Sequence, residues 1–164
     1  MRLVFFLITG IPILLAGLIY LTCREGSLLI NLIVEELAGG KLLESFKSLV
    51  SQTFKFSEAS VSSLPSALWV FSTAMLSSRI QIKKKALWYL MFISPLLYSV
   101  SLEVLQYYHI TDGTFDRVDL TYSVYGWLGA ACVAKLYDLL PSSIHLNLSS
   151  VVCCYFILVL GNVY

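Results

Sequence analysis

Ionisable and hydrogen-bonding side chains concentrate in one short stretch of an otherwise apolar chain. Residues 102–120 include one Glu, one Gln, one His, three Asp and one Arg. Carboxylates accept hydrogen bonds and bind cations, and two of them held together can serve as a general acid and a general base. The candidate functional residues in or beside this stretch are Glu103, Gln106, Asp116, Arg117, Asp119 and Gly126. Their catalytic roles are left open, because the chemistry depends on how the surrounding elements position them.

The composition indicates a protein whose solvent is lipid. Of the 164 residues, 58% are hydrophobic and only 13% are charged, which is about half the charged share of a soluble domain. The net charge of +1 argues against a nucleic-acid partner, which would need a basic face. No segment of domain size remains outside the apolar stretches, so residues 1–164 are expected to form a single membrane domain.

Five apolar stretches reach or approach the roughly 20 residues that a spanning helix needs. They are residues 3–22, 65–80, 86–108, 120–140 and 148–163. The second is the weakest, because serines dilute it, but a helix that faces protein rather than lipid could carry them. The first is longer than a usual signal-peptide core, so we expect it to be retained. The sequence therefore predicts an all-α polytopic bundle of about five spanning helices.

Basic residues set the expected orientation. Arg79, Lys83, Lys84 and Lys85 lie between the second and third stretches, and such a cluster is typical of a cytoplasmic loop. The N-terminus is then cytoplasmic, while the segment 24–64, the loop after Tyr108 and the C-terminus are outside.

The outer segment, about residues 24–64, carries an amphipathic pattern. Apolar residues recur at helical spacing and Gly39-Gly40 reads as a helix stop. The apolar positions are Leu42, Leu43, Phe46, Leu49, Val50 and Phe54. Residues 28–37 form another apolar piece before this stop, so we expect two helices at the outer membrane surface. They either cap the bundle or form a lid over an outer ligand, and the Ser-rich residues 57–63 are interpreted as a connector.

Two polar stripes are expected to meet at the outer end of the third and fourth helices. Spacings of three and four residues place each set on one helix face, and the short loop predicts antiparallel neighbours. The stripes are Ser99, Glu103 and Gln106, and Asp119, Ser123 and Gly126. A carboxylate at the depth of Glu103 should face the bundle interior, with Gln106 as a hydrogen-bond donor and Arg117 as a counter-ion. A proton relay and a buried structural pair both fit this pattern.

Packing signals lie along the same two helices. Gly126, Ala130 and Ala134 form a small-residue face that lets another helix approach closely. Pro95 is expected to bend the third helix. The bend either opens an outer cleft or only changes the helix direction.

Metal and cofactor sites are not expected. Asp112, Thr114, Asp116 and Asp119 suggest calcium ligands, but Arg117 stands where a calcium loop needs Gly. His109 and His145 fall on opposite sides of the membrane and form no pair. The four cysteines read as packing residues. The aromatic residues read as interface anchors or packing, and they are Trp69, Trp88, Tyr107, Tyr108 and Trp127.

Residues 86–140 resemble the VanZ-like family. The resemblance is carried by Glu103-x-x-Gln106, Gly113-Thr114-Phe115-Asp116, Asp119-Leu120 and Gly126. It implies a small polytopic protein of four or five helices in the bacterial cytoplasmic membrane, in a family whose founding member is associated with low-level resistance to the glycopeptide teicoplanin. The chain departs from the family pattern at Gly113 and Ser123, where many members have Arg and Asn.

Three functions follow from these patterns. The first is a VanZ-like envelope protein that binds or remodels an envelope lipid or cell-wall component at the outer face and affects glycopeptide susceptibility. The second is a membrane enzyme that acts on a lipid-linked envelope substrate through the carboxylates of Glu103 and Asp119. The third is a structural subunit with a membrane-protein partner.

Overall fold

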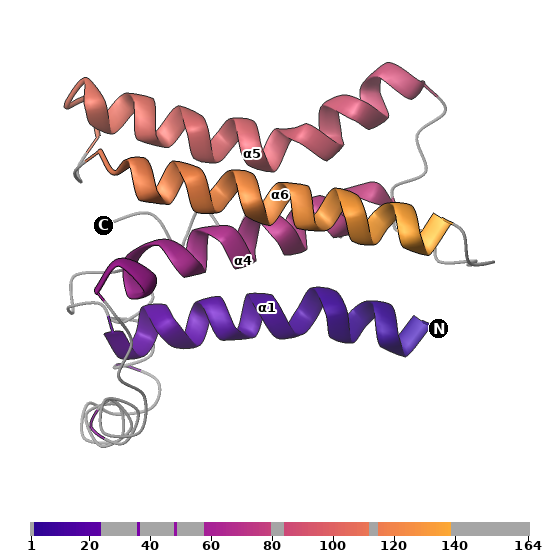
Figure 1. The fold of residues 1–164 in the computed structure, drawn as a ribbon, viewed down its shortest axis with the longest axis horizontal. Coiled ribbons are helices and arrows are strands. Elements are labelled where there is room, and N and C mark those ends of the chain that lie inside the picture. Colours follow the sequence, from indigo (N-terminus) through magenta and orange to yellow (C-terminus); the bar gives the residue numbers. More distant parts are fainter. Residues whose placement is uncertain are drawn as a thin grey trace.

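The structure, a computed structural model, describes residues 2–23, 58–79, 84–111 and 115–138, together with Glu36 and Ser48. This part of the chain is all-helical, as predicted, and contains no strand. Its helices are α1 (Arg2–Cys23), α4 (Glu58–Ser78), α5 (Lys85–Tyr107) and α6 (Arg117–Asp138) (Figure 1). The expected fifth span, residues 148–163, lies outside the described residues. So does the expected outer amphipathic segment, apart from two single residues and the start of α4.

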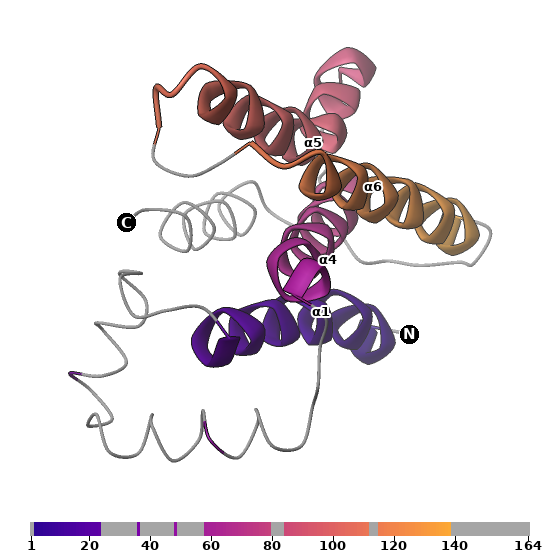
Figure 2. The same cartoon turned by 60° about the vertical axis from the view of Figure 1, so that its left-hand side comes forward.

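The four helices form an antiparallel arrangement with α4 at its centre. Successive helices run in opposite directions (Figure 1). The α4 helix packs most extensively against α6 and also contacts α1 and α5. The second view shows it between α1 and the α5–α6 pair (Figure 2). The second apolar stretch of the sequence, the weakest candidate for a span, is therefore the central helix.

Each helix has the length of a membrane span. They contain 22, 21, 23 and 22 residues, which at about 1.5 Å per residue corresponds to about 32–35 Å. Among the described helices, α5 alone is both long and apolar enough to qualify as a span by length and composition, and α1 contains the shorter apolar run Leu3–Ile19.

The central helix carries small polar residues into the protein interior. Ser63, Ser72, Thr73 and Ser77 of α4 are fully buried. The hydroxyl of Thr73 donates back to the carbonyl of Trp69 at 2.8 Å, which satisfies it without a partner from another helix. Burial among protein neighbours thus explains how a Ser-rich stretch can form a central helix.

Two boundaries differ from the sequence expectation. The α4 helix begins at Glu58, so the interpretation of residues 57–63 as a connector is wrong for nearly all of that segment. Serines disfavour helix interiors in isolated peptides, but packing against neighbouring helices outweighs this preference. The α6 helix begins at Arg117, so Asp119 lies in its first turn and not before it.

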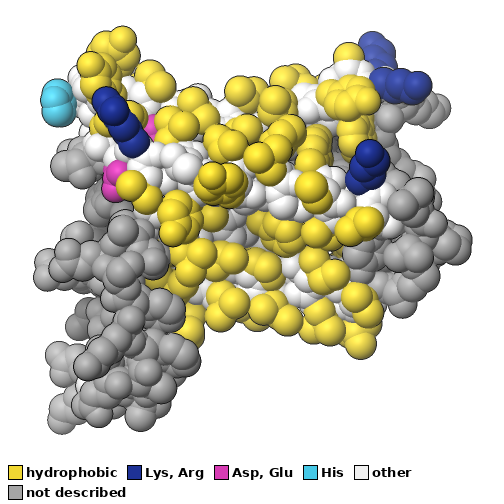
Figure 3. All heavy atoms as spheres, viewed as in Figure 1, with side chains coloured by type: hydrophobic (Ala, Val, Ile, Leu, Met, Phe, Trp, Pro, Cys, Tyr) yellow, Lys and Arg dark blue, Asp and Glu magenta, His cyan; other side chains and the backbone are white. Residues whose placement is uncertain are grey.

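Large apolar side chains lie on the outside of the bundle. Leu3, Leu14 and Leu90 are 72%, 73% and 54% exposed, whereas Thr9 of α1 and Ser123 of α6 are buried. Figure 3 shows hydrophobic side chains across the middle of the face that it draws, with the described charged side chains at its two ends. This distribution is the reverse of a soluble core, in which Leu is mostly buried and Ser mostly exposed.

The α5 helix bends near its middle (Figure 1), where Pro95 interrupts it as predicted. Proline has no N–H, so the carbonyl of Met91 loses its usual helical partner. The hydroxyl of Ser94 donates to that carbonyl at 2.8 Å. The next carbonyl, of Phe92, accepts a hydrogen bond from the indole Nε1 of Trp127 in α6 at 3.1 Å.

Tryptophan side chains also fix the N-terminal half of α5 to its neighbours. Trp88 donates through Nε1 to the carbonyl of Ser78, the last residue of α4, at 3.2 Å. The ring of Phe92 stacks on that of Trp88, with 5.5 Å between centroids, and lies 5.5 Å from that of Trp127. Trp88 and Trp127 therefore serve helix packing, one of the roles expected from the sequence.

Candidate functional site

The candidate site lies where α5 ends and α6 begins. Beyond Tyr107 the chain turns through a Schellman motif, in which Ile110 N–H donates to the Leu105 carbonyl at 2.9 Å and His109 N–H to the Gln106 carbonyl at 3.0 Å. His109 has a φ of 55° at the position that glycine usually occupies. This turn ends α5 and directs the chain back towards α6.

Asp116 caps α6. Its carboxylate Oδ1 accepts a hydrogen bond from the N–H of Val118 at 2.8 Å, so it satisfies one of the N–H groups that have no partner in a first helical turn. The sequence placed Asp116 in a candidate site, and the structure gives it a definite structural role as well.

Glu103 joins the two helices. It is only 6% exposed and lies one turn before the end of α5. Its Oε2 accepts a hydrogen bond from the backbone N–H of Asp116 at 3.0 Å. The expectation that this carboxylate faces the protein interior is thus confirmed, and its donor is a main-chain group.

The expected partners of Glu103 take other positions. Arg117 is exposed and forms no ion pair with Glu103, so the prediction of a counter-ion is wrong. As the first residue of α6, Arg117 keeps its charge in solvent, which avoids the cost of desolvation. Gln106 is half-buried on the same face of α5, and its side chain does not supply the observed hydrogen bond to Glu103.

Asp119 completes a group of three carboxylates. Asp116 and Asp119 both lie close enough to Glu103 for their charges to act on it. The Oδ1 atom of Asp119 is buried and has no hydrogen-bond partner in the described part of the chain. Buried acceptors are nearly always paired, so this atom is suited to a donor supplied by a bound molecule.

One helical turn deeper in the protein than the carboxylates, a hydrogen bond between side chains joins α5 to α6. Ser99 Oγ and Ser123 Oγ lie 2.7 Å apart, which confirms that the two predicted polar stripes face each other. One turn further along α6, a Cβ on Gly126 would overlap the carbonyl oxygen of Ala67 and lie 3.0 Å from its carbonyl carbon. Gly126 therefore allows α4 and α6 to approach closely, and it packs below the carboxylates.

The structure adds one residue that the sequence patterns did not single out. Thr111 Oγ1, in the turn after α5, is buried and, like Asp119 Oδ1, has no hydrogen-bond partner among the described residues. A lone threonine in a loop carries no distinguishing signal in a sequence. Asp112, Gly113 and Thr114, which belong to the same loop, lie outside the described residues.

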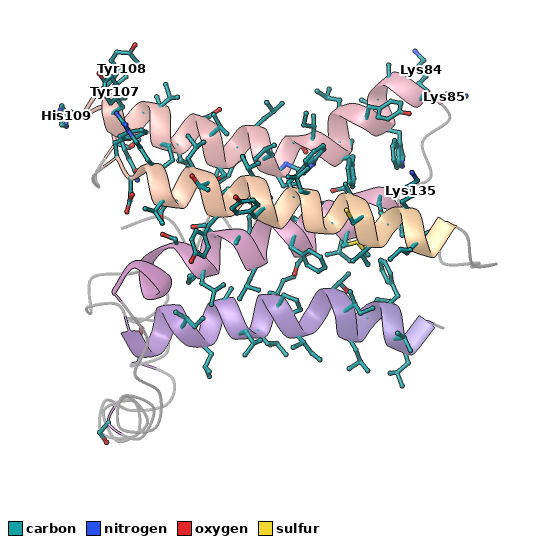
Figure 4. All side chains as sticks on the ribbon, in the orientation of Figure 1. Lys84, Lys85, Tyr107, Tyr108, His109 and Lys135 are labelled. Carbon is teal, nitrogen blue, oxygen red and sulfur yellow. The ribbon has the colours of Figure 1, made fainter. Side chains whose placement is uncertain are left out.

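The chemistry of this group is that of a hydrogen-bond acceptor. Its three carboxylates can receive hydroxyl, amide or ammonium donors. Among the described residues, no group of three or more His, Cys, Asp or Glu side chains is arranged to hold a metal ion. Figure 4 shows Tyr107, Tyr108 and His109 at this end of α5, opposite the end that carries Lys84 and Lys85.

No family model, no curated protein and no solved structure matches the chain.

Proposed function

We propose that the chain is an integral membrane protein whose four described helices belong to a bundle of about five spans. The apolar side chains of α1, α5 and α6 would contact lipid, while the buried Ser63, Ser72, Thr73 and Ser77 of α4 stay inside the protein. Aromatic residues stand near both ends of α5, with Tyr89 63% exposed at one end and Tyr107 61% exposed at the other. Such positions are typical of the two membrane–water interfaces.

Membrane insertion can be tested by extraction. After expression of the full chain, membranes are washed with alkaline carbonate and then with a non-ionic detergent. We expect the protein to stay in the pellet in carbonate and to dissolve only in detergent. Release by carbonate alone would contradict the proposal. Reporter fusions at each terminus would then test the proposed orientation, with the N-terminus cytoplasmic and the C-terminus outside.

We further propose that the chain is a VanZ-like envelope protein that binds an envelope component through Glu103, Asp116 and Asp119. The observation that carries this proposal is the buried Oδ1 of Asp119, which has no hydrogen-bond partner among the described residues, since a ligand that donates a hydrogen bond would satisfy it. A hydroxyl, amide or amine of a lipid headgroup or cell-wall precursor has that property. In the proposed orientation, with the N-terminus cytoplasmic, the site faces the outside of the cell.

The functional experiment compares two neighbouring substitutions in α6. In a bacterial host that depends on the protein for reduced teicoplanin susceptibility, Asp119→Asn is expected to abolish the phenotype at an unchanged protein level, because the neutral amide oxygen accepts a weaker hydrogen bond from a ligand than the charged carboxylate does. Thr121→Ala is the matched control, because Thr121 is exposed and its hydroxyl donates only to its own helix, at Arg117. Full resistance in Asp119→Asn would refute the proposal.

A structural role is the second candidate, because Glu103 already holds the start of α6. On this alternative the chain is a subunit of a membrane complex and the carboxylates are fixed internal contacts. A clear fall in the melting temperature of Asp119→Asn would favour it. The enzyme alternative rests on the proximity of Glu103 to Asp116 and Asp119 alone.

A further inference from the structure

A group of cations lies at the end of the bundle opposite the carboxylates. Lys84 and Lys85 stand at the start of α5 and Lys135 in the last turn of α6. Figure 4 shows all three at the same end. We call Lys84, Lys85, Lys135 and the neighbouring Tyr89 the basic end.

The lysine side chains of the basic end are accessible for binding. All three are exposed, and none of them forms an ion pair with another described side chain. The first turn of α5 contains no acidic residue, and Asp138 is the single acidic residue of the four described helices at this end. Arg79, directly after α4, adds a further positive charge to the same end.

An aromatic residue beside the lysines places them at the membrane surface. Tyr89 follows Lys85 by one helical turn and is 63% exposed. Its ring contacts that of Trp88, with 5.0 Å between centroids, and Trp88 is itself tied to the end of α4. Tyrosine at this level is typical of the headgroup region, so in a membrane the ammonium groups of Lys84 and Lys85, one turn outward, would lie at the level of the phosphates.

We propose that the basic end binds the phosphate groups of anionic lipids in the leaflet that it faces. This inference rests on the proposed membrane insertion and concerns a surface remote from the carboxylates. Charge complementarity carries it: three exposed ammonium groups from two helices, with no ion pair to another described side chain, meet headgroups that have a net negative charge. Each lysine near a charged bilayer surface contributes an affinity factor of roughly fivefold.

The experiment measures lipid binding by the full chain. The protein is purified in a non-ionic detergent and titrated with dioleoyl phosphatidylglycerol or dioleoyl phosphatidylcholine, and bound lipid is counted by native mass spectrometry. We expect tighter binding of phosphatidylglycerol. The triple variant Lys84→Gln, Lys85→Gln, Lys135→Gln should lose more than tenfold of that affinity and keep its affinity for phosphatidylcholine.

Two control variants separate charge at this surface from other effects. Replacing the same three lysines by arginine preserves the charge, so the preference for phosphatidylglycerol should remain. Arg117→Gln removes one positive charge from the opposite end and should weaken binding less than Lys84→Gln does. Equal losses in these two single variants would mean that lipids respond to total charge, which would overturn the proposal.

Further outcomes distinguish this inference from the proposal on which it rests. If carbonate releases the chain from membranes, insertion fails and the inference fails with it. If the inserted protein binds both lipids equally, only the inference is overturned. Competition by millimolar glycerol phosphate would also overturn it, since the site would then recognise a free phosphate ester and not a lipid surface.

Discussion

The Glu103 carboxylate in α5 accepts a hydrogen bond from the backbone N–H of Asp116, and the Asp116 side chain in turn caps α6. Two helix ends that are separated by a turn of the chain are thereby fixed to each other. The Ser99–Ser123 hydrogen bond supports the same contact one turn deeper. Glu103 is therefore a structural residue whatever it binds, and its removal should be measurable as a loss of stability.

Replacing Glu103 by leucine should destabilise the protein by about 1–3 kcal/mol, because the N–H of Asp116 would be left without an acceptor. For a chain of this size that corresponds to a fall in melting temperature of about 2–4 °C per kcal/mol. Thermal unfolding of the purified protein in detergent measures it. Glu103→Gln retains an acceptor oxygen and should lose less than half as much. Equal losses in both variants would show that the negative charge, and not the hydrogen bond, stabilises the contact.

The contact between α4 and α6 should be intolerant of any side chain at Gly126. A Cβ there meets the backbone of Ala67, which cannot move without displacing α4. Gly126→Ala is expected to destabilise the protein by about 1–3 kcal/mol, as overpacking usually does. Gly129→Ala is the control, because its Cβ would meet only the side chain of Phe71 at 3.5 Å. Similar unfolding temperatures for the two variants would contradict the close approach at Gly126.

Trp127 should compensate for the bend at Pro95. Trp127→Phe keeps an aromatic ring and removes the N–H that donates to the Phe92 carbonyl, so we expect a loss of about 1–3 kcal/mol. In a Pro95→Ala background α5 can regain its regular hydrogen bonds, and the same substitution should cost less. A double-mutant cycle of unfolding free energies measures this coupling. Additive effects would mean that the indole does not act on the bend.

His109 should be replaceable by glycine with a gain in stability. A non-glycine residue in the left-handed region costs roughly 1–2 kcal/mol, which a glycine avoids. Glycine also increases the entropy of the unfolded chain, and this effect reduces the gain by about 0.4–1 kcal/mol. His109→Gly should therefore raise the unfolding free energy by up to about 1 kcal/mol. His109→Ala removes the imidazole but keeps the strained backbone, so it should show no gain. A gain of the same size in both variants would place the effect in the side chain.

The sequence predicts α1 and α5 closely, because each is a long and almost uninterrupted apolar run. The predicted stretches 3–22 and 86–108 differ from α1 and α5 by about one residue at each end, because long apolar runs end at charged or aromatic residues. The sequence does not predict the start of α4 at Glu58, because a Ser-rich segment forms a helix here only when neighbouring helices bury it. Periodicity could not show that burial.

The sequence predicts which residues form the candidate site, but it does not predict which hydrogen bonds they make. Helical spacing brought Glu103 and Ser99 onto one face, and the Ser99–Ser123 hydrogen bond confirms the pairing of stripes. The donor to Glu103 is a main-chain N–H, and its position depends on the path of the turn, which side-chain types do not encode. For the same reason Arg117 appeared to be a counter-ion, although the helix start directs it outward.

Asp119 should behave in the opposite way to Glu103. Its buried Oδ1 receives no hydrogen bond in the described part of the chain, so this oxygen adds a desolvation cost to the folded state that no hydrogen bond from those residues offsets. Asp119→Asn should leave the melting temperature unchanged or raise it, whereas Glu103→Leu lowers it. Thermal unfolding of both variants beside wild type in the same detergent gives the comparison. A stable Asp119→Asn protein that has lost its phenotype would mean that the carboxylate is retained for a ligand, as costly buried charges in membranes often are. A clear fall in its melting temperature would instead assign Asp119 to the same structural contact as Glu103.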